Sequence, residues 1–186
     1  HGIDTLDEGE LIRRFLEHVA GKQFQLWGFN SSGSDLPILR QRAIALEMPC
    51  PRFATRPSKP WLGMDYFDTR TSDAHMDIMQ LLSGHQRGAA TPSLDEFCAA
   101  CGVPGKLDID GGQVADLFLQ GNIRQIVEYN ATDALTTHLL ALRIALHAGQ
   151  LDAEGYAAEI RAARQLVQEQ IDRGKEQFVK FNDAWQ

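Results

Sequence analysis

The chain has 186 residues, of which 44% are hydrophobic, so it is long enough to bury one sizeable core. Its 25 acidic residues outnumber 18 Lys and Arg, and the net charge of −7 argues against a basic protein that grips nucleic acid through cationic side chains alone. No apolar run approaches the roughly 18 residues of a membrane span, and three Cys do not suggest a disulfide framework, so we expect a cytoplasmic protein.

The N-terminal part of the chain predicts the order helix, strand, helix. Thr5 and Glu8 have the spacing of a capping box, and the apolar residues that follow recur with a helical period. The short apolar run at residues 24–30 is typical of a buried strand, which ends at Asn30. Asp35 then stands at the N-cap or in the first turn of a second helix.

The middle of the chain is less regular. Residues 49–64 are rich in Pro and predict an extended surface loop. Residues 75–82 fit a strand or a helix. Ser93 and Glu96 have the spacing of a second capping box, which opens a short helix.

The C-terminal part is predicted to be helical. A short helix is indicated near residues 113–119, and residues 122–147 have the apolar period of a long helix. The tail, residues 152–186, favours helix by its content of Ala, Glu, Gln and Arg. This helical tail could pack on the rest of the chain or on a second copy, so a homodimer through it is one expectation.

Three features have a possible chemical role but a more frequent structural one. Cys98 and Cys101 form a CxxC pair, which without a second ligand pair is more often two small apolar residues of a packed helix. His75 and Asp77 alternate on a possible strand, as two metal ligands do, yet a buried or paired His and Asp is commoner. Lys106 lies in a turn-rich stretch that could reach a phosphate, although lone loop lysines are usually solvated.

Two carboxylates stand out more strongly. Asp35 follows a buried strand, where open α/β sheets place functional groups, although a helix cap alone explains it. Tyr129 and Asp133 share one helical face, and an Asp inside a helix is a mild misfit that asks for a reason. On this feature alone, a structural Tyr/Asp hydrogen bond is favoured over a chemical role. Phosphodiester hydrolysis by two hard cations needs carboxylates from separate elements, and a Tyr hydroxyl beside a bound water could orient it.

Four segments resemble, in their order and spacing, the bacterial predicted 3′–5′ exonucleases related to the proofreading domain of family B DNA polymerases. The segments are residues 28–39, 75–82, 93–106 and 128–143. The resemblance covers about residues 8–151 and implies the α/β, three-layer ribonuclease H-like fold of the DEDD exonucleases, helix-rich here. We therefore expect an exonuclease domain over residues 1–151 and a C-terminal helical extension over residues 152–186.

The resemblance also implies roles for single residues. Asn30 and Asp35 match the family's second motif, in which Ser34 replaces the usual aromatic residue, and Tyr129 and Asp133 match its third motif, Tyr-x-x-x-Asp. By resemblance, Asp35 and Asp133 would be metal ligands, Tyr129 would orient the attacking water, and Asn30 would hold the substrate or the turn. A Tyr at this position indicates the tyrosine branch.

The function implied is a two-metal-ion 3′–5′ exonuclease that uses Mg²⁺ or Mn²⁺ and releases nucleoside monophosphates from single-stranded DNA or RNA 3′ ends. The family's first motif, Asp-x-Glu at the end of an apolar strand, does not occur in these residues. We expect that motif and its strands upstream of His1, the alternative being a naturally shortened relative, and we expect the 186 residues alone to be inactive. The alternative is a catalytically silent ribonuclease H-like module that binds nucleic acid or a protein.

Overall fold

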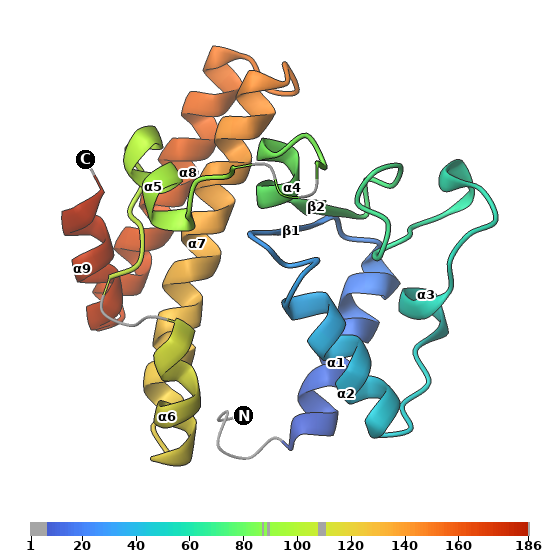
Figure 1. The fold of residues 1–186 in the computed structure, drawn as a ribbon. Coiled ribbons are helices and arrows are strands. Elements are labelled where there is room, and N and C mark those ends of the chain that lie inside the picture. The colour runs from blue at the N-terminus through green and yellow to red at the C-terminus, as the bar shows by residue number, and fades with distance from the viewer. Residues whose placement is uncertain (1–6, 87, 89, 108–110, 186) are drawn as a thin grey trace. The chain divides into compact units, whose positions relative to one another are not determined.

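The computed structural model describes residues 7–86, 88, 90–107 and 111–185. The chain forms two compact units, which we call the first unit, within residues 1–91, and the second unit, within residues 92–186. Helices dominate the chain, and the described residues include a small parallel sheet of two strands in the first unit (Figure 1). A mostly helical α/β structure was expected and is confirmed, whereas the three-layer ribonuclease H-like arrangement stays a prediction.

The first unit begins with the predicted order of helix, strand and helix. Its elements are α1 (Glu8–Lys22), β1 (Leu26–Gly28), α2 (Asp35–Ala45), α3 (Pro51–Ala54), the 3₁₀ helix η2 (Pro60–Leu62), β2 (His75–Asp77) and α4 (Ile78–Leu82). The ambiguous stretch at 75–82 is both a strand and a helix, in that order. The predicted loop at 49–64 is wrong in part, because α3 and η2 each begin at a Pro, whose fixed φ suits the first helical position.

Helix α1 starts two residues later than a capping box at Thr5 requires. Its N-cap is Asp7, whose side chain accepts a hydrogen bond from the Glu10 backbone N–H at 2.7 Å. Thr5 lies outside the described residues. The helix ends before Gln23, which adopts a left-handed conformation with φ of 54°.

The core of the first unit is built on one face of α1. Ile12, Leu16 and Val19 are buried and pack with residues of α2, α3 and the segment before β2. Leu11 and Phe15, which share the apolar period, remain 42% and 40% exposed because they lie beside this buried stripe.

Strands β1 and β2 run parallel, with Leu26 opposite His75 and Gly28 opposite Asp77. Both strands therefore end at the same edge of the sheet. The connection from β1 to α2 and the first turn of α4 both start from that edge, which is where the sequence places Asn30, Asp35 and Asp77.

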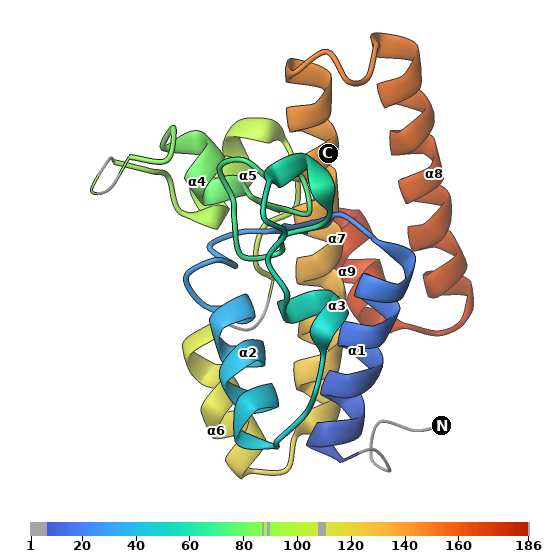
Figure 2. The same ribbon diagram turned by 90° about the vertical axis from the view of Figure 1, so that its right-hand side faces the viewer.

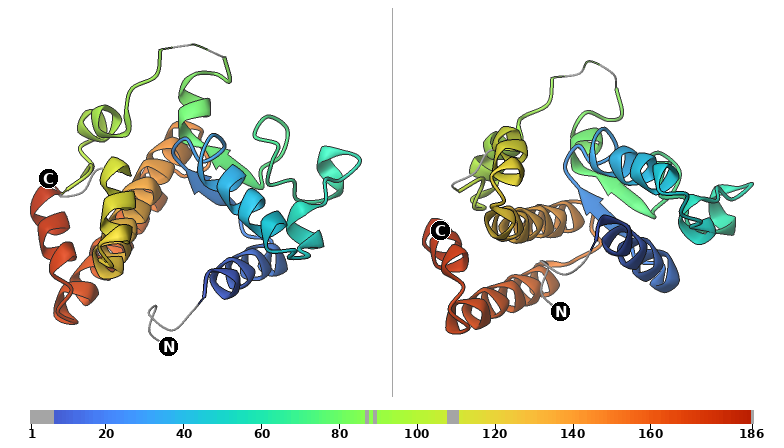
Figure 3. Two further views of the ribbon diagram at one scale, coloured as in Figure 1. Left: turned by 60° about the horizontal axis from the view of Figure 1, so that its bottom comes forward. Right: turned by 90° about the horizontal axis from the view of Figure 1, so that it is seen from below.

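The second unit is helical throughout its described residues. Its elements are α5 (Leu94–Cys101), the 3₁₀ helix η3 (Gly111–Gln113), α6 (Val114–Leu119), α7 (Ile123–His147), α8 (Ala153–Asp172) and α9 (Glu176–Ala184). The long helix α7 contacts α5, α6, α8 and α9. Figure 2 shows α8 returning alongside α7 after a short turn, and Figure 3 shows α9 beside α8.

The predicted helical tail contributes to the core of this unit. Val167 of α8 and Phe181 of α9 are completely buried, as are Leu139 and Leu140 of α7. The tail therefore packs on α7, while the domain boundary at residue 151 and the homodimer stay predictions. Within the described ranges, none of the helices is both long and apolar enough to cross a membrane.

The capping box predicted at Ser93 and Glu96 is confirmed. The Ser93 N–H donates to Glu96 Oε2 at 2.8 Å, and the Glu96 N–H donates to Ser93 Oγ at 3.3 Å. Ser93→Ala is expected to lower the free energy of unfolding by about 1 kcal/mol, because the cap loses its hydroxyl acceptor. Urea titration followed by circular dichroism measures this loss. Ser93→Thr keeps a hydroxyl, so its free energy of unfolding should fall much less. Equal losses of stability in Ser93→Ala and Ser93→Thr would contradict the capping role.

Candidate functional site

The connection between β1 and α2 is a tight turn organised by Asn30. This residue has a φ of 58°, a left-handed conformation that Asn tolerates better than most residues. Its carbonyl oxygen accepts hydrogen bonds from the Gly33 and Ser34 backbone N–H groups, each at 3.0 Å. A Cβ on Gly33 would lie 2.6 Å from Asn30 Oδ1, so a larger residue there would displace the Asn30 side chain. The turn brings the chain to Asp35 at the start of α2.

Asp35 is exposed in the first turn of α2. Ser34 occupies the N-cap position without capping through its side chain, so the first-turn alternative for Asp35 is correct. Ser34 Oγ lies 2.9 Å from Asp35 Oδ2 and donates to it or to the Asn30 carbonyl oxygen at 3.0 Å. Among the described residues, Asp35 Oδ1 accepts no hydrogen bond, and the helix N-terminus stabilises its negative charge. This carboxylate is accessible to a cation.

Asp77 fixes the same turn from the neighbouring strand. Its side chain is 2% exposed. Oδ1 accepts hydrogen bonds from the Asn30 N–H at 3.0 Å and the Met79 N–H at 3.1 Å. Oδ2 accepts one from the Ser32 N–H at 2.9 Å and another from the Ser32 hydroxyl. Asp77 therefore caps α4 and anchors the β1 to α2 connection, which favours the structural interpretation over the metal-ligand one.

His75 is likewise a structural residue. It is 1% exposed, and its Nε2 lies 2.7 Å from the Ser31 hydroxyl oxygen. Burial lowers the pKa of His75 below its usual 6.5, against the opposing effects of the Asp77 and Asp35 charges. His75 Nδ1 is buried, and no group in the described part of the chain makes a hydrogen bond of good geometry with it. The Tyr66 backbone also favours the protonated ring, but this effect on the pKa is smaller than that of burial. The ring is therefore neutral at neutral pH.

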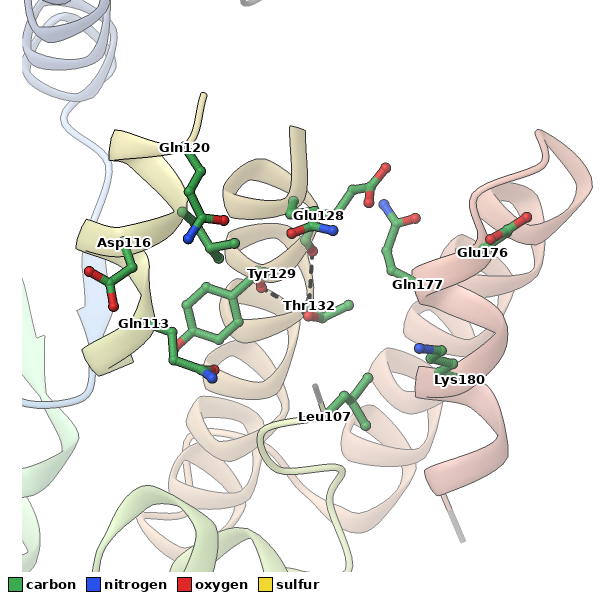
Figure 4. Close-up of a pocket in the computed structure, with 12 residues that line it drawn as sticks. Leu107, Gln113, Asp116, Gln120, Glu128, Tyr129, Thr132, Glu176, Gln177 and Lys180 are labelled. Atoms are coloured by element: carbon green, nitrogen blue, oxygen red, sulfur yellow. Dashed lines mark hydrogen bonds between the residues drawn. The ribbon is translucent and has the colours of Figure 1, made fainter. Parts of the chain in front are cut away.

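Tyr129 and Asp133 lie one turn apart on α7, and both are half-buried. The Tyr129 carbonyl oxygen accepts a hydrogen bond from the buried Thr132 hydroxyl at 2.9 Å, an arrangement common for Thr within helices. The Tyr129 ring lines a cavity of about 620 Å³ between α6, α7 and α9, with its hydroxyl end beside Gln113 (Figure 4). A cavity of this size can hold a small ligand or part of a larger one.

The cavity wall is mainly polar. Besides Tyr129 and Thr132, it comprises Leu107, Gln113, Asp116, Leu117, Gln120, Gln125, Glu128, Glu176, Gln177 and Lys180. Acidic residues outnumber the single Lys among these, so the cavity itself does not attract phosphate strongly. Sequence reasoning did not find this cavity, because its residues come from α6, α7, α9 and the segment before α6, with no shared motif.

The family model for a predicted 3′–5′ exonuclease related to the exonuclease domain of PolB matches residues 2–185. The chain belongs to this exonuclease family. The match extends through α8 and α9, beyond the residues that the four segments cover. No curated protein and no solved structure matches the chain.

The predicted site residues of this exonuclease fall into two pairs. Asn30 and Asp35 lie together in the first unit, and Tyr129 and Asp133 lie together in the second. Carboxylate oxygens are suitable ligands for Mg²⁺ and Mn²⁺. Within the described ranges, however, no group of three or more His, Cys, Asp or Glu residues is arranged to hold a metal ion. Asp35 and Asp133 thus have the right donor chemistry without a complete ligand set around either.

An Asp-x-Glu sequence does occur at residues 152–154, but it is a helix cap. Asp152 is the N-cap of α8, and its side chain accepts a hydrogen bond from the Gly155 N–H at 2.7 Å. It does not follow a strand, so it does not have the structural setting of the exonuclease family's first motif.

The segment at 93–106 supports α7 near the third motif. Asp95 Oδ1 accepts a hydrogen bond from the Lys106 N–H at 2.8 Å, and the Thr136 hydroxyl of α7 donates to the Pro104 carbonyl oxygen at 2.8 Å. A Cβ on Gly105 would lie 2.7 Å from Asp95 Oδ1. The Gly-Lys turn is thus held against α5 and α7, with the Lys106 side chain exposed.

The CxxC pair has the properties of packed thiols. Cys98 is 1% exposed, and burial, reinforced by Asp95, Cys101 and then Asp133, raises its thiol pKa from 9.0 to about 12. Burial also raises the pKa of Cys101, against the effect of Arg143. The thiolate is the reactive form, so these thiols are poor nucleophiles and redox groups.

Thiol labelling tests this interpretation. A pKa of about 12 in place of 9.0 reduces the Cys98 thiolate roughly a thousandfold at neutral pH. Cys98 should therefore react with iodoacetamide at least about 10³-fold more slowly in the folded chain than in urea, as peptide mass spectrometry can measure. Because the folded-state pKa is raised, stability from this group is present below pH 9 and falls as pH rises toward 12. Rapid labelling of folded Cys98 at neutral pH would contradict the burial.

Proposed function

We propose that this protein is a metal-dependent 3′–5′ exonuclease that hydrolyses phosphodiester bonds at the 3′ ends of single-stranded DNA or RNA and releases nucleoside monophosphates. The observation that carries the proposal is the exonuclease family match over residues 2–185. The exposed Asp35 carboxylate and the Tyr129 and Asp133 pair on α7 support it, since they are acidic and hydroxyl groups of the required type.

In this proposal Asp35 and Asp133 bind divalent cations, Mg²⁺ or Mn²⁺. Asp35 suits this role because one of its oxygens accepts no hydrogen bond from the described residues. Such cations, when bound, stabilise developing charge on the phosphate and lower the pKa of a bound water. They also let a chain of net charge −7 approach a phosphodiester.

Tyr129 and Asn30 would act on the water and the substrate. The Tyr129 hydroxyl would orient the attacking water by a hydrogen bond, because Tyr both donates and accepts. The exposed Asn30 amide would contact the substrate strand, while the bonds from Asn30 to Asp77 and to residues 33 and 34 keep its backbone fixed.

Two-metal hydrolysis needs more carboxylates than Asp35 and Asp133. The 186 residues contain no Asp-x-Glu at the end of an apolar strand. We propose that the complete protein, with any residues that precede His1, supplies them. The 186-residue chain alone should then cleave far more slowly, and equal rates for both forms would contradict this part of the proposal.

A polarity assay tests the proposed function. The complete protein is incubated with a 5′-labelled single strand and Mg²⁺ or Mn²⁺, and products are resolved at single-nucleotide spacing. We expect a ladder that shortens from the 3′ end, release of nucleoside monophosphates, and no cleavage in EDTA. A strand with an inverted 3′-terminal nucleotide should resist. Binding of the strand without cleavage in either metal would favour the silent binding module instead.

A further inference from the structure

The stretch between Glu47 and Asp65 has an unusual charge for this protein. It contains three cations, Arg52, Arg56 and Lys59, and no acidic residue, although the chain as a whole carries a net charge of −7. Figure 1 shows most of this stretch as the long connection between α3 and β2. Cations in such a setting attract a polyanion locally.

Both ends of this connection are anchored in the first unit. Phe53 of α3 is 3% exposed and stacks on Tyr66 with 4.6 Å between ring centroids and 6° between ring planes. The Arg56 Nε donates to Asp65 Oδ2 at 2.7 Å, so this guanidinium is already paired. The residues between Arg56 and Asp65 therefore form a loop that is fixed to the first unit at both ends.

At the tip of the connection, Trp61 projects into solvent. It is 75% exposed, and the adjacent Leu62 is 62% exposed. The Lys59 ammonium lies 5.3 Å from the centroid of the Trp61 ring, and the Leu62 N–H donates to the Lys59 carbonyl oxygen at 3.0 Å. These contacts hold the ring beside a cation while leaving most of it accessible.

This exposure is exceptional for tryptophan in the chain. Trp27 is half-buried, and Trp185 is 8% exposed. Leaving a large aromatic ring in water forgoes the free energy of its burial, and a ring displayed beside a cation has an open face on which a flat ligand can stack. Lys59 and Arg52 make no ion pair with the described residues, so their charges are available to a ligand.

We propose that Trp61 is a stacking platform for the bases of single-stranded nucleic acid, with Lys59 contacting the phosphates. The identity of the ligand rests on the proposed function. An aromatic face beside cations is the arrangement that binds single strands without sequence preference, because every base has a stacking face. Such binding suits an enzyme that must accept any sequence at the 3′ end. The surface is separate in sequence from all the predicted site residues.

The test compares binding of two polyanions that differ only in their bases. A short oligothymidylate and an abasic strand of the same length are titrated into the full chain in EDTA and low salt, followed by tryptophan fluorescence and by anisotropy of a labelled strand. EDTA prevents metal-dependent cleavage during the titration. We expect the oligothymidylate to quench tryptophan fluorescence and the abasic strand to quench it little.

Substitutions then assign the signal. Trp61→Ala should weaken oligothymidylate binding about tenfold, which is roughly 1.4 kcal/mol, and remove the quenching, with abasic binding unchanged. Trp61→Phe should keep most of the affinity. Lys59→Ala should weaken binding of both strands and reduce the salt dependence of binding by about one phosphate contact, a slope of roughly 0.7. The matched control, Leu62→Ala, removes the adjacent apolar side chain, which is 62% exposed, and should change neither the affinity for either strand nor the quenching.

Three outcomes would overturn the proposal. They are no quenching by the oligothymidylate, an equal loss of affinity for both strands in Trp61→Ala, or a loss of oligothymidylate affinity in Leu62→Ala as large as that in Trp61→Ala. The last outcome would point to a generally apolar surface that docks a protein. None of these readouts requires cleavage. Failure of the nuclease proposal would instead appear as absent cleavage with base-dependent binding intact.

Discussion

Asp133→Asn in the complete protein is expected to reduce 3′–5′ cleavage at least about 10³-fold while leaving the fold intact. In the proposed site this carboxylate binds a cation, whose loss removes several kcal/mol of charge stabilisation, and each 1.4 kcal/mol or so changes a rate tenfold. Asn has nearly the same shape as Asp, so α7 and its contacts with α5, α6, α8 and α9 should remain. Cleavage of a 5′-labelled strand and far-UV circular dichroism measure the two effects.

The control for this variant is Asp183→Asn. Asp183 is also a helical aspartate, but it is exposed on α9 and belongs to no predicted motif. Its replacement should leave cleavage within about twofold of the wild-type rate, as expected for a surface position away from the chemistry. Normal cleavage by Asp133→Asn would show that the Tyr-x-x-x-Asp pair on α7 is only structural.

Asp77→Ala is expected to have the largest effect on stability, at least about 3 kcal/mol. The substitution removes the acceptor of the Asn30, Ser32 and Met79 backbone N–H groups, and each of these part-buried donors left unpaired costs about 1 kcal/mol. It also removes the N-cap of α4. Urea unfolding followed by tryptophan fluorescence measures the loss, and hydrogen exchange should be faster at the same three amides.

Asp73→Ala provides the matched control, because Asp73 lies four residues earlier and is exposed. It should change stability by less than about 0.5 kcal/mol. Asp77→Asn keeps one acceptor oxygen, so its loss of stability should lie between those of Asp77→Ala and Asp73→Ala. If Asp77→Ala cost less than about 1 kcal/mol, the turn that carries Asn30 and Asp35 would be held by something other than this carboxylate.

Elements with strong local signals were predictable from sequence. The capping box at Ser93 fixes the start of α5, and the apolar period of residues 122–147 matches α7 to within one residue. Residues 75–82 were ambiguous because a three-residue strand passes directly into a five-residue helix, too short for either period to show. The Pro-rich stretch concealed two short helices, since Pro at a first helical turn and Pro in a loop look alike in sequence.

The candidate site was predictable only where it is local. Tyr129 and Asp133 are four residues apart on one helix, so their common face follows from the helical period. The role of Asp77 depends on partners 45 and 47 residues away across the parallel sheet, which no local pattern shows. The exposure of Trp61 is likewise a tertiary property, because the same residue in a Pro-rich segment could equally pack inward.

The central claim is that Asp35 and Asp133 both serve the same metal-dependent hydrolysis, and a double-mutant cycle on the complete protein tests it most directly. Cleavage rates of a 5′-labelled single strand in Mn²⁺ are compared for wild type, Asp35→Asn, Asp133→Asn and the double variant. Residues that act as a unit give non-additive losses. We predict that each single variant loses at least about 10³-fold and that the double variant is no slower than either. Wild-type rates in a single variant, or losses that multiply in the double variant, would contradict the claim.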